Sequence, residues 1–134
     1  MYLLDTNVIS ELRKPKPHGG VTAWIKSVPS DQLLLPALAL GELQAGVERT
    51  RRQDPQKAAS IEAWIDTLSG AYEILPMNGP IFREWARLMD GNSEHLLEDA
   101  MIAATARVLR LTVVTRNVRD FKQLKAEVFN PFVR

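Results

Sequence analysis

Four acidic residues, spread widely along the chain, are the first candidates for chemistry: Asp5, Glu42, Asp99 and Asp120. Asp5 and Asp120 follow short apolar segments, whereas Glu42 and Asp99 fall in the first two turns of predicted helices. Taken singly, each has an ordinary explanation, such as a helix cap, a turn residue or a favourable charge at a helix N-terminus. Taken together, they predict a pocket of carboxylates, which repel one another unless a cation compensates their charge.

Such a cation would have to be held by oxygen. The 134-residue chain has no cysteine, which excludes disulfides, thiol nucleophiles and thiolate zinc sites. Its two histidines, His18 and His95, lie far apart and lack the spacing of metal ligands. Oxygen ligands favour Mg²⁺, Mn²⁺ or Ca²⁺. The formal net charge of +1 does not by itself point to nucleic acid.

Glu42 has unusual neighbours for an acid on a helix. A glutamate on a solvent-exposed helix face usually has polar neighbours, but most residues on the face of Glu42 are apolar or small. They are Leu38, Ala39, Ala45 and Gly46. The alternative explanation of Glu42 is an ion pair with Arg49, about two turns further along the same face.

These residues need elements to position them, and short apolar segments alternate here with segments of helical periodicity. The predicted buried strands span residues 2–4, 33–35, 72–75 and 111–114, with a weaker one near 127–129. The predicted helices span residues 7–13, 37–49, 56–68, 80–89 and 96–109, with another around 21–28. The alternation predicts one α/β domain with a mostly parallel sheet covered on both faces. Strand C-termini and helix N-termini then meet at one edge, where ligands usually bind and where all four acids fall.

The chain resembles a PIN-domain protein of the VapC/FitB type, the toxin half of bacterial toxin–antitoxin pairs. The resemblance rests on LLDTNVISEL at 3–12, PALALGELQAGV at 36–47, EDAMIAATARVLRLTVVTRNVRDF at 98–121 and VFNPF at 128–132. It implies a single PIN domain over residues 1–134, which is an α/β/α sandwich. The central, mostly parallel sheet would have about five strands in the order 3-2-1-4-5, with Asp5 and Asp120 beside the switch point of the sheet.

Residue by residue, the resemblance places the family's catalytic, metal-binding acids on Asp5, Glu42, Asp99 and Asp120. The family usually has a single acid before its Ala-x-Ile-Ala-Ala run, whereas this chain has Glu98 and Asp99. We choose Asp99, because its helical face is the one that also carries Ala103 and Ala106. The family's supporting polar residues fall on Thr6, Asn7, Thr115 and Asn117.

The activity that the resemblance implies is a Mg²⁺- or Mn²⁺-dependent endoribonuclease, which hydrolyses RNA phosphodiester bonds with metal-activated water. We expect Asp5 and Asp99 to bind the metal directly. Glu42 and Asp120 could bind it through water, help to deprotonate that water, or hold a second ion. Basic residues that could grip the RNA backbone are Arg49, Arg116, Arg119 and the group Arg13, Lys14 and Lys16. Each basic cluster alone is equally typical of a solvated surface.

The resemblance also implies a homodimer and a cognate, DNA-binding antitoxin. We expect the antitoxin to lay a segment along an apolar groove between the early helices. It could also push an arginine into the acidic pocket, where the guanidinium would replace the charge of the metal. Three tryptophans on helical patterns, Trp24, Trp64 and Trp85, are either core residues or groove and dimer contacts.

Two other functions stay open at this point. A FitB-like protein could serve mainly as the regulatory subunit of a DNA-binding toxin–antitoxin complex, with weak or incidental nuclease activity. A small DNA flap nuclease would use the same acids. The first residues lack the pattern of a signal peptide, and no segment approaches a membrane span of roughly 20 apolar residues. We therefore expect a cytoplasmic protein with no membrane contact.

Overall fold

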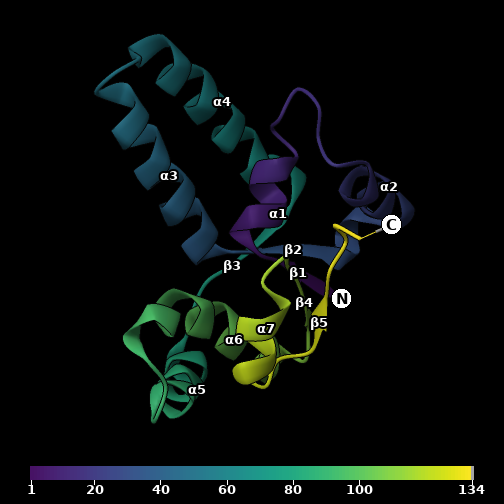
Figure 1. The fold of residues 1–134 in the computed structure, drawn as a ribbon, viewed down its shortest axis with the longest axis vertical. Coiled ribbons are helices and arrows are strands. Elements are labelled where there is room, and N and C mark those ends of the chain that lie inside the picture. The colour runs from purple at the N-terminus through teal and green to yellow at the C-terminus, as the bar shows by residue number, and fades with distance from the viewer. Residues whose placement is uncertain (134) are drawn as a thin grey trace.

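The computed structural model describes residues 1–133, so that residue 134 of the predicted domain lies outside the described part. A parallel sheet of five strands runs through the centre of the molecule in the order β3-β2-β1-β4-β5 (Figure 1), which confirms the predicted fold. The strands are β1 (Tyr2–Leu4), β2 (Leu33–Pro36), β3 (Glu73–Leu75), β4 (Thr112–Val114) and β5 (Val128–Phe129).

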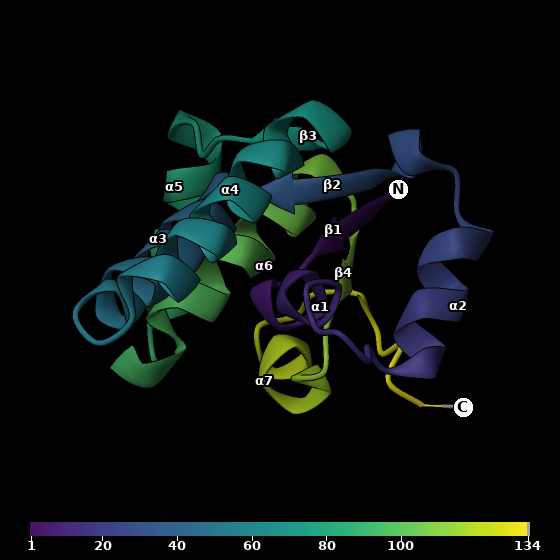
Figure 2. The same ribbon diagram turned by 90° about the horizontal axis from the view of Figure 1, so that it is seen from above.

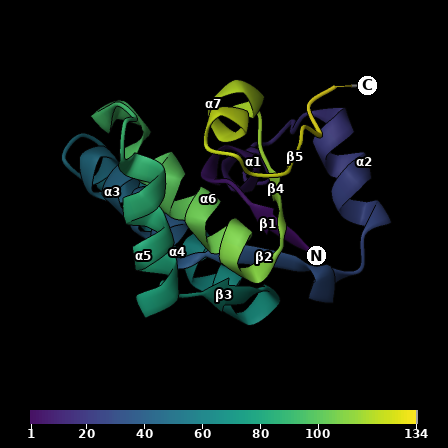
Figure 3. The same cartoon turned by 90° about the horizontal axis from the view of Figure 1, so that it is seen from below.

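Helices cover both faces of the sheet. They are α1 (Thr6–Glu11), α2 (Gly19–Ser27), α3 (Ala37–Arg51), α4 (Pro55–Ala71), α5 (Gly79–Met89), α6 (Leu97–Leu109) and α7 (Val118–Gln123). Two short 3₁₀ helices, η1 (Ser30–Gln32) and η2 (Glu94–Leu96), precede β2 and α6. Figure 1 shows α3 and α4 as a long hairpin on one side of the sheet and α5, α6 and α7 on the other. Figure 3 shows α5 and α6 side by side, and they are packed closely together.

The two faces of the sheet bury separate cores because successive side chains of a strand point to opposite sides. Leu3 belongs to the cluster under α5, α6 and α7, whereas the next residue, Leu4, belongs to the cluster under α1 to α4. Val113 and Val114 divide in the same way. All four side chains are fully buried. Apart from Thr112 at the start of β4, the central strands β1 and β4 are therefore apolar, as is usual for parallel strands buried on both faces.

The sheet also has the switch point that the site needs. β1 pairs with β2 on one side and with β4 on the other, in register from Tyr2 to Leu4 along β4. The crossovers leave in opposite directions from these neighbouring strands, and ligands of such sheets bind in the crevice at the C-terminal ends of the two strands. Asp5 follows β1 directly, and its backbone N–H still donates to the carbonyl of Val114, with a distance of 2.9 Å.

The structure corrects three details of the predicted elements. The helix predicted to close before Ser69 and Gly70 continues to Ala71, because packing of Ile65 and Leu68 in the cores outweighs the weak helix propensity of glycine. It also starts one residue earlier than predicted, at Pro55, with Asp54 as its cap. No helix was predicted after Thr115, but residues 118–123 form α7, a helix too short to show a helical period, fixed by the buried Phe121.

All three tryptophans are partly buried against the cores. Trp24 lies between Tyr2 and Phe129, with ring centroids 5.0 and 5.2 Å away. Trp64 packs against the cores under α3 and α4, and the indole N–H of Trp85 donates to the carbonyl of Leu97. Along residues 1–133, no helix is long and apolar enough to cross a membrane.

The C-terminal turn is docked on the start of α2, and Figure 2 shows these two segments side by side at the far side of the molecule from α3. A Cβ atom at Gly20 would lie 2.6 Å from the carbonyl oxygen of Pro131. Real Cβ atoms essentially never come so close to a backbone oxygen, so only glycine lets the two segments meet here.

Gly20→Ala is therefore expected to destabilise the protein by about 1–3 kcal/mol, since the chain must shift to relieve the overlap. Gly41→Ala is the matched control, because a Cβ there meets nothing within 4 Å and Ala in a helix interior stabilises by about 0.5–1 kcal/mol. Urea unfolding of the two variants measures both effects. A Gly20→Ala protein as stable as the Gly41→Ala protein would contradict the close docking.

Candidate active site

Asp5 is the most constrained of the predicted site residues. Asp5 is only 4% exposed, yet both of its carboxylate oxygens accept hydrogen bonds. Oδ1 accepts from the backbone N–H of Thr6 at 2.8 Å, which caps α1. Oδ2 accepts from the Thr115 hydroxyl at 2.8 Å and from the Asn7 side-chain amide at 3.1 Å. Burial raises the pKa of Asp5 above its usual range, and the hydrogen bond from Thr115 partly offsets this effect.

The polar residues predicted to support the site join two loops that are more than a hundred residues apart. The Asn7 side chain accepts from the backbone N–H of Arg116 at 3.3 Å, and its amide lies 3.5 Å from the Thr115 hydroxyl. That hydroxyl also accepts from the backbone N–H of Asn117 at 2.8 Å. The loop after β1 and the loop after β4 are therefore fixed to each other around the carboxylate of Asp5.

Glu42 faces the same crevice from the second turn of α3. Its Oε1 accepts from the Thr6 hydroxyl at 2.7 Å, so that Thr6 links the first acid to the second. No ion pair between Glu42 and Arg49 is present among residues 1–133, and the alternative explanation of Glu42 is therefore wrong. Burial, followed by a hydrogen bond with the Glu98 carboxyl group, raises the pKa of Glu42 to about 7.

Glu98 is the residue that the sequence reasoning left out. Asp99 was chosen over it, but the carboxyl group of Glu98 lies against that of Glu42, while Asp99 interacts with Asp5 and Asp120. The two adjacent acids in the first turn of α6 therefore reach different members of the group. The sequence did contain a sign of this role, namely a second acid next to Asp99. Adjacent residues on a helix point only 100° apart, so both can face a ligand-binding edge.

The pKa of Asp99 is raised by burial and by the neighbouring acids. The residue is partly buried, and burial followed by repulsion from Asp5, Asp120 and Glu98 raises its pKa to about 6. Asp120 lies in the first turn of α7 and is also partly buried. We call the five residues that interact in this way the acid cluster: Asp5, Glu42, Glu98, Asp99 and Asp120.

The donor set of the acid cluster fits a hard divalent cation. It consists of carboxylate oxygens alone, with the hydroxyl of Thr115 beside them. Burial and then the neighbouring carboxyl groups raise the pKa of Glu42 to about 7 and that of Asp99 to about 6, and a bound cation would relieve this repulsion. As the side chains stand, no three acidic or histidine residues within residues 1–133 are grouped closely enough to hold an ion.

Two of the predicted basic residues lie in a groove beside Glu42. Arg13 and Arg49 line a groove of about 370 Å³ between α1, α3 and α4, which Thr6 and Glu42 also line. We call this cavity the α1–α3–α4 groove, and its aliphatic lining comes from Leu43, Val47 and Ile61. Lys14 instead forms an ion pair with Glu11 at 3.0 Å. Lys16 and Arg119 are exposed, and Arg116 stacks on the ring of Phe132.

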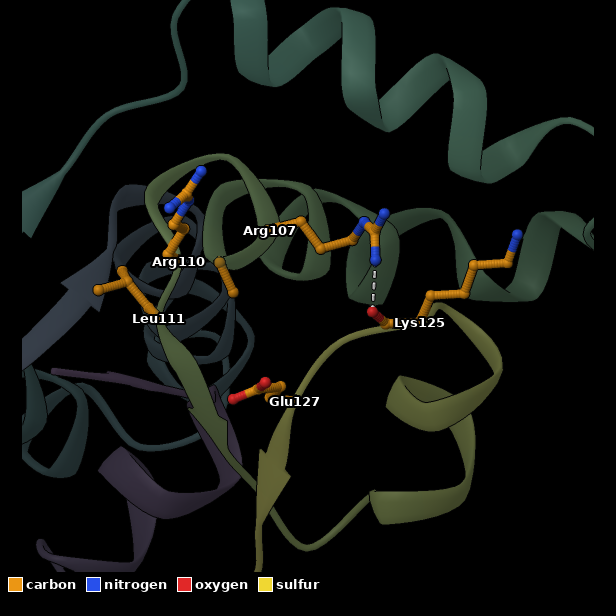
Figure 4. A pocket seen from close by; sticks show the side chains of 6 residues that line it. Arg107, Arg110, Leu111, Lys125 and Glu127 are labelled. Atoms are coloured by element: carbon orange, nitrogen blue, oxygen red, sulfur yellow. Dashed lines mark hydrogen bonds between the residues drawn. The ribbon is translucent and has the colours of Figure 1, made fainter.

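A second cavity, of about 390 Å³, lies at the opposite edge of the sheet, where β4 and β5 begin (Figure 4). Arg107, Arg110 and Lys125 lie around it together with the acid Glu127. Arg107 is already engaged, since it donates to the carbonyl of Lys125 and forms an ion pair with Glu84. None of the predicted site residues lines this cavity.

Residues 2–127 match the PIN domain, and the chain belongs to this family. Over 139 residues it is 33% identical to Toxin FitB of Neisseria gonorrhoeae, with 98% of this chain and 99% of the relative covered. Over 143 residues it is 34% identical to the VapC ribonuclease Y4jK of Sinorhizobium fredii, with 98% of each chain covered. The protein is thus a relative of the FitB and VapC toxins of toxin–antitoxin systems.

Solved structures agree with this assignment. The crystal structure of FitAcB from Neisseria gonorrhoeae contains a chain that is 32% identical and superposes with a TM-score of 0.87, with 100% of both chains covered. A structure of FitAB bound to an IR36 DNA fragment gives a TM-score of 0.75 at 30% identity, over 100% of this chain and 97% of the other.

Repulsion in the acid cluster predicts how the stability of the metal-free protein changes with pH. Because the folded-state pKa of Asp99 is raised, its contribution to stability is full below its ordinary value of 3.8 and is lost as the pH rises through about 6. Asp99→Asn removes this loss. In EDTA the variant should be more stable than the wild type at about pH 8 and should lose this advantage near pH 4.

The expected gain at the higher pH is about 1 kcal/mol, because solvent screens a side chain that is only half buried. Urea unfolding between about pH 4 and pH 8 measures it. Asp31→Asn is the control, since Asp31 is exposed and precedes β2 at the other edge of the sheet. If Asp99→Asn were the less stable protein at high pH, the carboxylates would not repel one another as described.

Proposed function

We propose that this protein is a Mg²⁺- or Mn²⁺-dependent endoribonuclease and the toxin of a toxin–antitoxin pair. The observation that carries the proposal is the acid cluster at the switch point, where burial raises the pKa of Asp5, and burial together with repulsion raises the pKa values of Glu42 and Asp99. Buried carboxylates with raised pKa values are typical of catalytic and metal-binding sites. Relatives of this chain include proteins named as VapC ribonucleases.

A divalent cation bound to these carboxylates would supply a positive charge for the phosphoryl oxygens and lower the pKa of water. Asp5 and Asp99 would hold it, because Asp5 is fixed by three donors and Asp99 faces it from α6. Glu42 has a pKa near neutrality and so can take the proton of the attacking water. Thr6 orients Glu42 through its hydroxyl, while Thr115 and Asn7 keep Asp5 in place.

The RNA substrate would be held by the basic residues that surround the acid cluster. Arg13 and Arg49 lie in the α1–α3–α4 groove, while Arg116 and Arg119 lie on the loop and helix that follow β4. Phosphate contacts of this kind position a nucleic acid without reading its sequence. The arginines also offset the repulsion between the acid cluster and a polyanion.

Asp5→Asn is the first test. Asn keeps an oxygen for the cap of α1 and nearly the same volume, so the variant should fold, but it loses the charge that holds a metal. Cleavage of labelled RNA in Mg²⁺ or Mn²⁺ is expected to fall at least about 100-fold, the scale of losing one essential electrostatic contact. Asp31→Asn should cleave like the wild type.

The same assay with DNA and with EDTA separates the alternatives. RNA cleavage that persists in EDTA, or that is unaffected by Asp5→Asn, would contradict the metal-dependent mechanism. Cleavage of flap DNA with no cleavage of RNA would favour the flap nuclease.

We also propose that a cognate antitoxin inhibits the enzyme through the α1–α3–α4 groove. The groove has the aliphatic lining and the position between early helices that such a segment needs, and it leads to Glu42 and Thr6 of the site. An arginine of the antitoxin placed beside the acid cluster would supply a positive charge and so compete with the metal.

Gly46→Gln tests the antitoxin site without touching an acid. Gly46 lines the groove and has room for a Cβ, which would meet only the Arg49 guanidinium at 3.7 Å. A longer side chain there should fill the groove and weaken antitoxin inhibition at least tenfold. Because the groove is also proposed to hold RNA through Arg13 and Arg49, inhibition is measured relative to the RNA cleavage of the same variant without antitoxin. Gly41→Gln, on the same helix and facing open space, should be inhibited like the wild type. If both variants were inhibited equally, the antitoxin would bind elsewhere.

The regulatory function is a second candidate, favoured by the similarity to a FitAB complex whose structure contains DNA. In that case the chain would act mainly within a DNA-bound complex with its antitoxin. Asp5→Asn distinguishes the two functions, because it should abolish RNA cleavage and toxicity yet leave binding of the complex to promoter DNA intact.

The homodimer stays a prediction. The surface to test for it is formed by exposed apolar side chains of α5 and α6, which include Phe82, Leu97 and Val108.

A further inference from the structure

The Arg116 side chain is held by residues from two distant parts of the chain. Its guanidinium carbon lies 3.9 Å from the centroid of the Phe132 ring. A guanidinium nitrogen of Arg116 also lies 3.9 Å from Oε1 of Glu11, at the end of α1. Stacking on an aromatic face and a nearby carboxylate together restrict the rotamers of a long side chain that would otherwise be mobile.

Both partners of Arg116 are themselves anchored. The Glu11 side chain is only 6% exposed and accepts from the Lys14 ammonium and from the backbone N–H of His18, each at 3.0 Å. The Lys14 hydrogen bond is the main cause that lowers the pKa of Glu11 and so keeps it charged. The Phe132 ring packs 5.4 Å from that of His18, and the Phe132 N–H donates to the Asn130 side chain at 2.9 Å.

The position of Arg116 connects this arrangement to the acid cluster. Arg116 lies between Thr115 and Asn117, and its backbone N–H donates to the Asn7 side chain that also contacts Asp5. Its side chain is 55% exposed, and within residues 1–133 its guanidinium donates no hydrogen bond. The stacked face is occupied, but the edge that carries the N–H donors has only the Glu11 carboxylate near it among residues 1–133, at 3.9 Å.

We propose that Arg116 contacts a phosphate of the RNA backbone beside the cleaved bond, and that Phe132 is a positioning residue that holds Arg116 for this contact. The proposal rests on the proposed function. A guanidinium edge presents parallel N–H donors that match two phosphate oxygens. Because Phe132 and Glu11 already hold the side chain, less conformational entropy is lost when the RNA binds.

A purely structural role is the rival explanation, in which Arg116 only fastens the C-terminal turn to the rest of the molecule. The two roles predict different effects of replacing Phe132 on RNA binding. If Phe132 acts through Arg116, its replacement matters only while Arg116 is present. If it acts on the fold alone, its replacement has the same effect with and without Arg116.

A double-mutant cycle of Arg116→Gln and Phe132→Leu measures this coupling. The readout is the binding of fluorescein-labelled single-stranded RNA by anisotropy in EDTA, where a metal-dependent nuclease cannot cleave it, over a series of NaCl concentrations. Arg116→Gln should reduce the salt slope by about 0.7, the loss of one phosphate contact on a single strand. Phe132→Leu should weaken binding about two- to fivefold in the wild type and cause no further loss in the Arg116→Gln background.

Two further variants complete the experiment. Phe132→Tyr keeps the aromatic face and should bind RNA like the wild type. Arg110→Gln removes an arginine from the opposite edge of the sheet and should leave the salt slope unchanged (Figure 4). Equal weakening by Phe132→Leu in both backgrounds, an unchanged slope in Arg116→Gln, or the absence of RNA binding by the wild type would overturn the proposal.

Failure of the proposed function would look different. A wild-type protein that cleaves no RNA in Mg²⁺ or Mn²⁺ would refute the nuclease, whereas the anisotropy cycle needs no cleavage. The two results are therefore read independently.

Discussion

The buried carboxylate of Asp5 is the group on which the rest of the site depends. A charge at 4% exposure is costly unless donors or a cation compensate it. Three donors do so in part, from Thr6, Asn7 and Thr115, and they come from loops that follow neighbouring strands. The same contacts cap α1 and fix the loop after β4 to the loop after β1. The stability of this corner of the fold is thus inseparable from the geometry of the site.

Much of this arrangement could be predicted from the sequence. The four acids fall after strands or at helix starts, so the edge they share follows from the parallel α/β pattern, while the strand order came from the resemblance. Glu98 was missed because one helical face was taken as the only one that could reach the site. The stacking of Arg116 on Phe132 could not be predicted, because it depends on how the C-terminal turn docks against α2 at Gly20.

Charge is distributed unevenly in a chain whose formal net charge is only +1. The acid cluster concentrates carboxyl groups at one edge of the sheet, and the pKa values of Asp5, Glu42 and Asp99 are raised there. Arg13 and Arg49 in the groove, and Arg116 beyond Thr115, lie around that edge. A net charge near zero therefore hides local regions of strong electrostatic potential. For this reason the net charge gave no information about the proposed RNA substrate.

The same electrostatic constraint connects the proposed activity with its proposed inhibition. Carboxylates that repel one another gain from any cation that can reach them, whether it is a metal ion or a guanidinium. Within residues 1–133, two nearby arginines do not relieve this repulsion: Arg49 forms no ion pair with Glu42, and Arg116 is held by Glu11 and Phe132. With these arginines held apart, the cluster would be able to bind a metal. It would equally be open to an arginine from a partner, so that a site proposed to hold a divalent ion is by the same physics one that a protein cation could block.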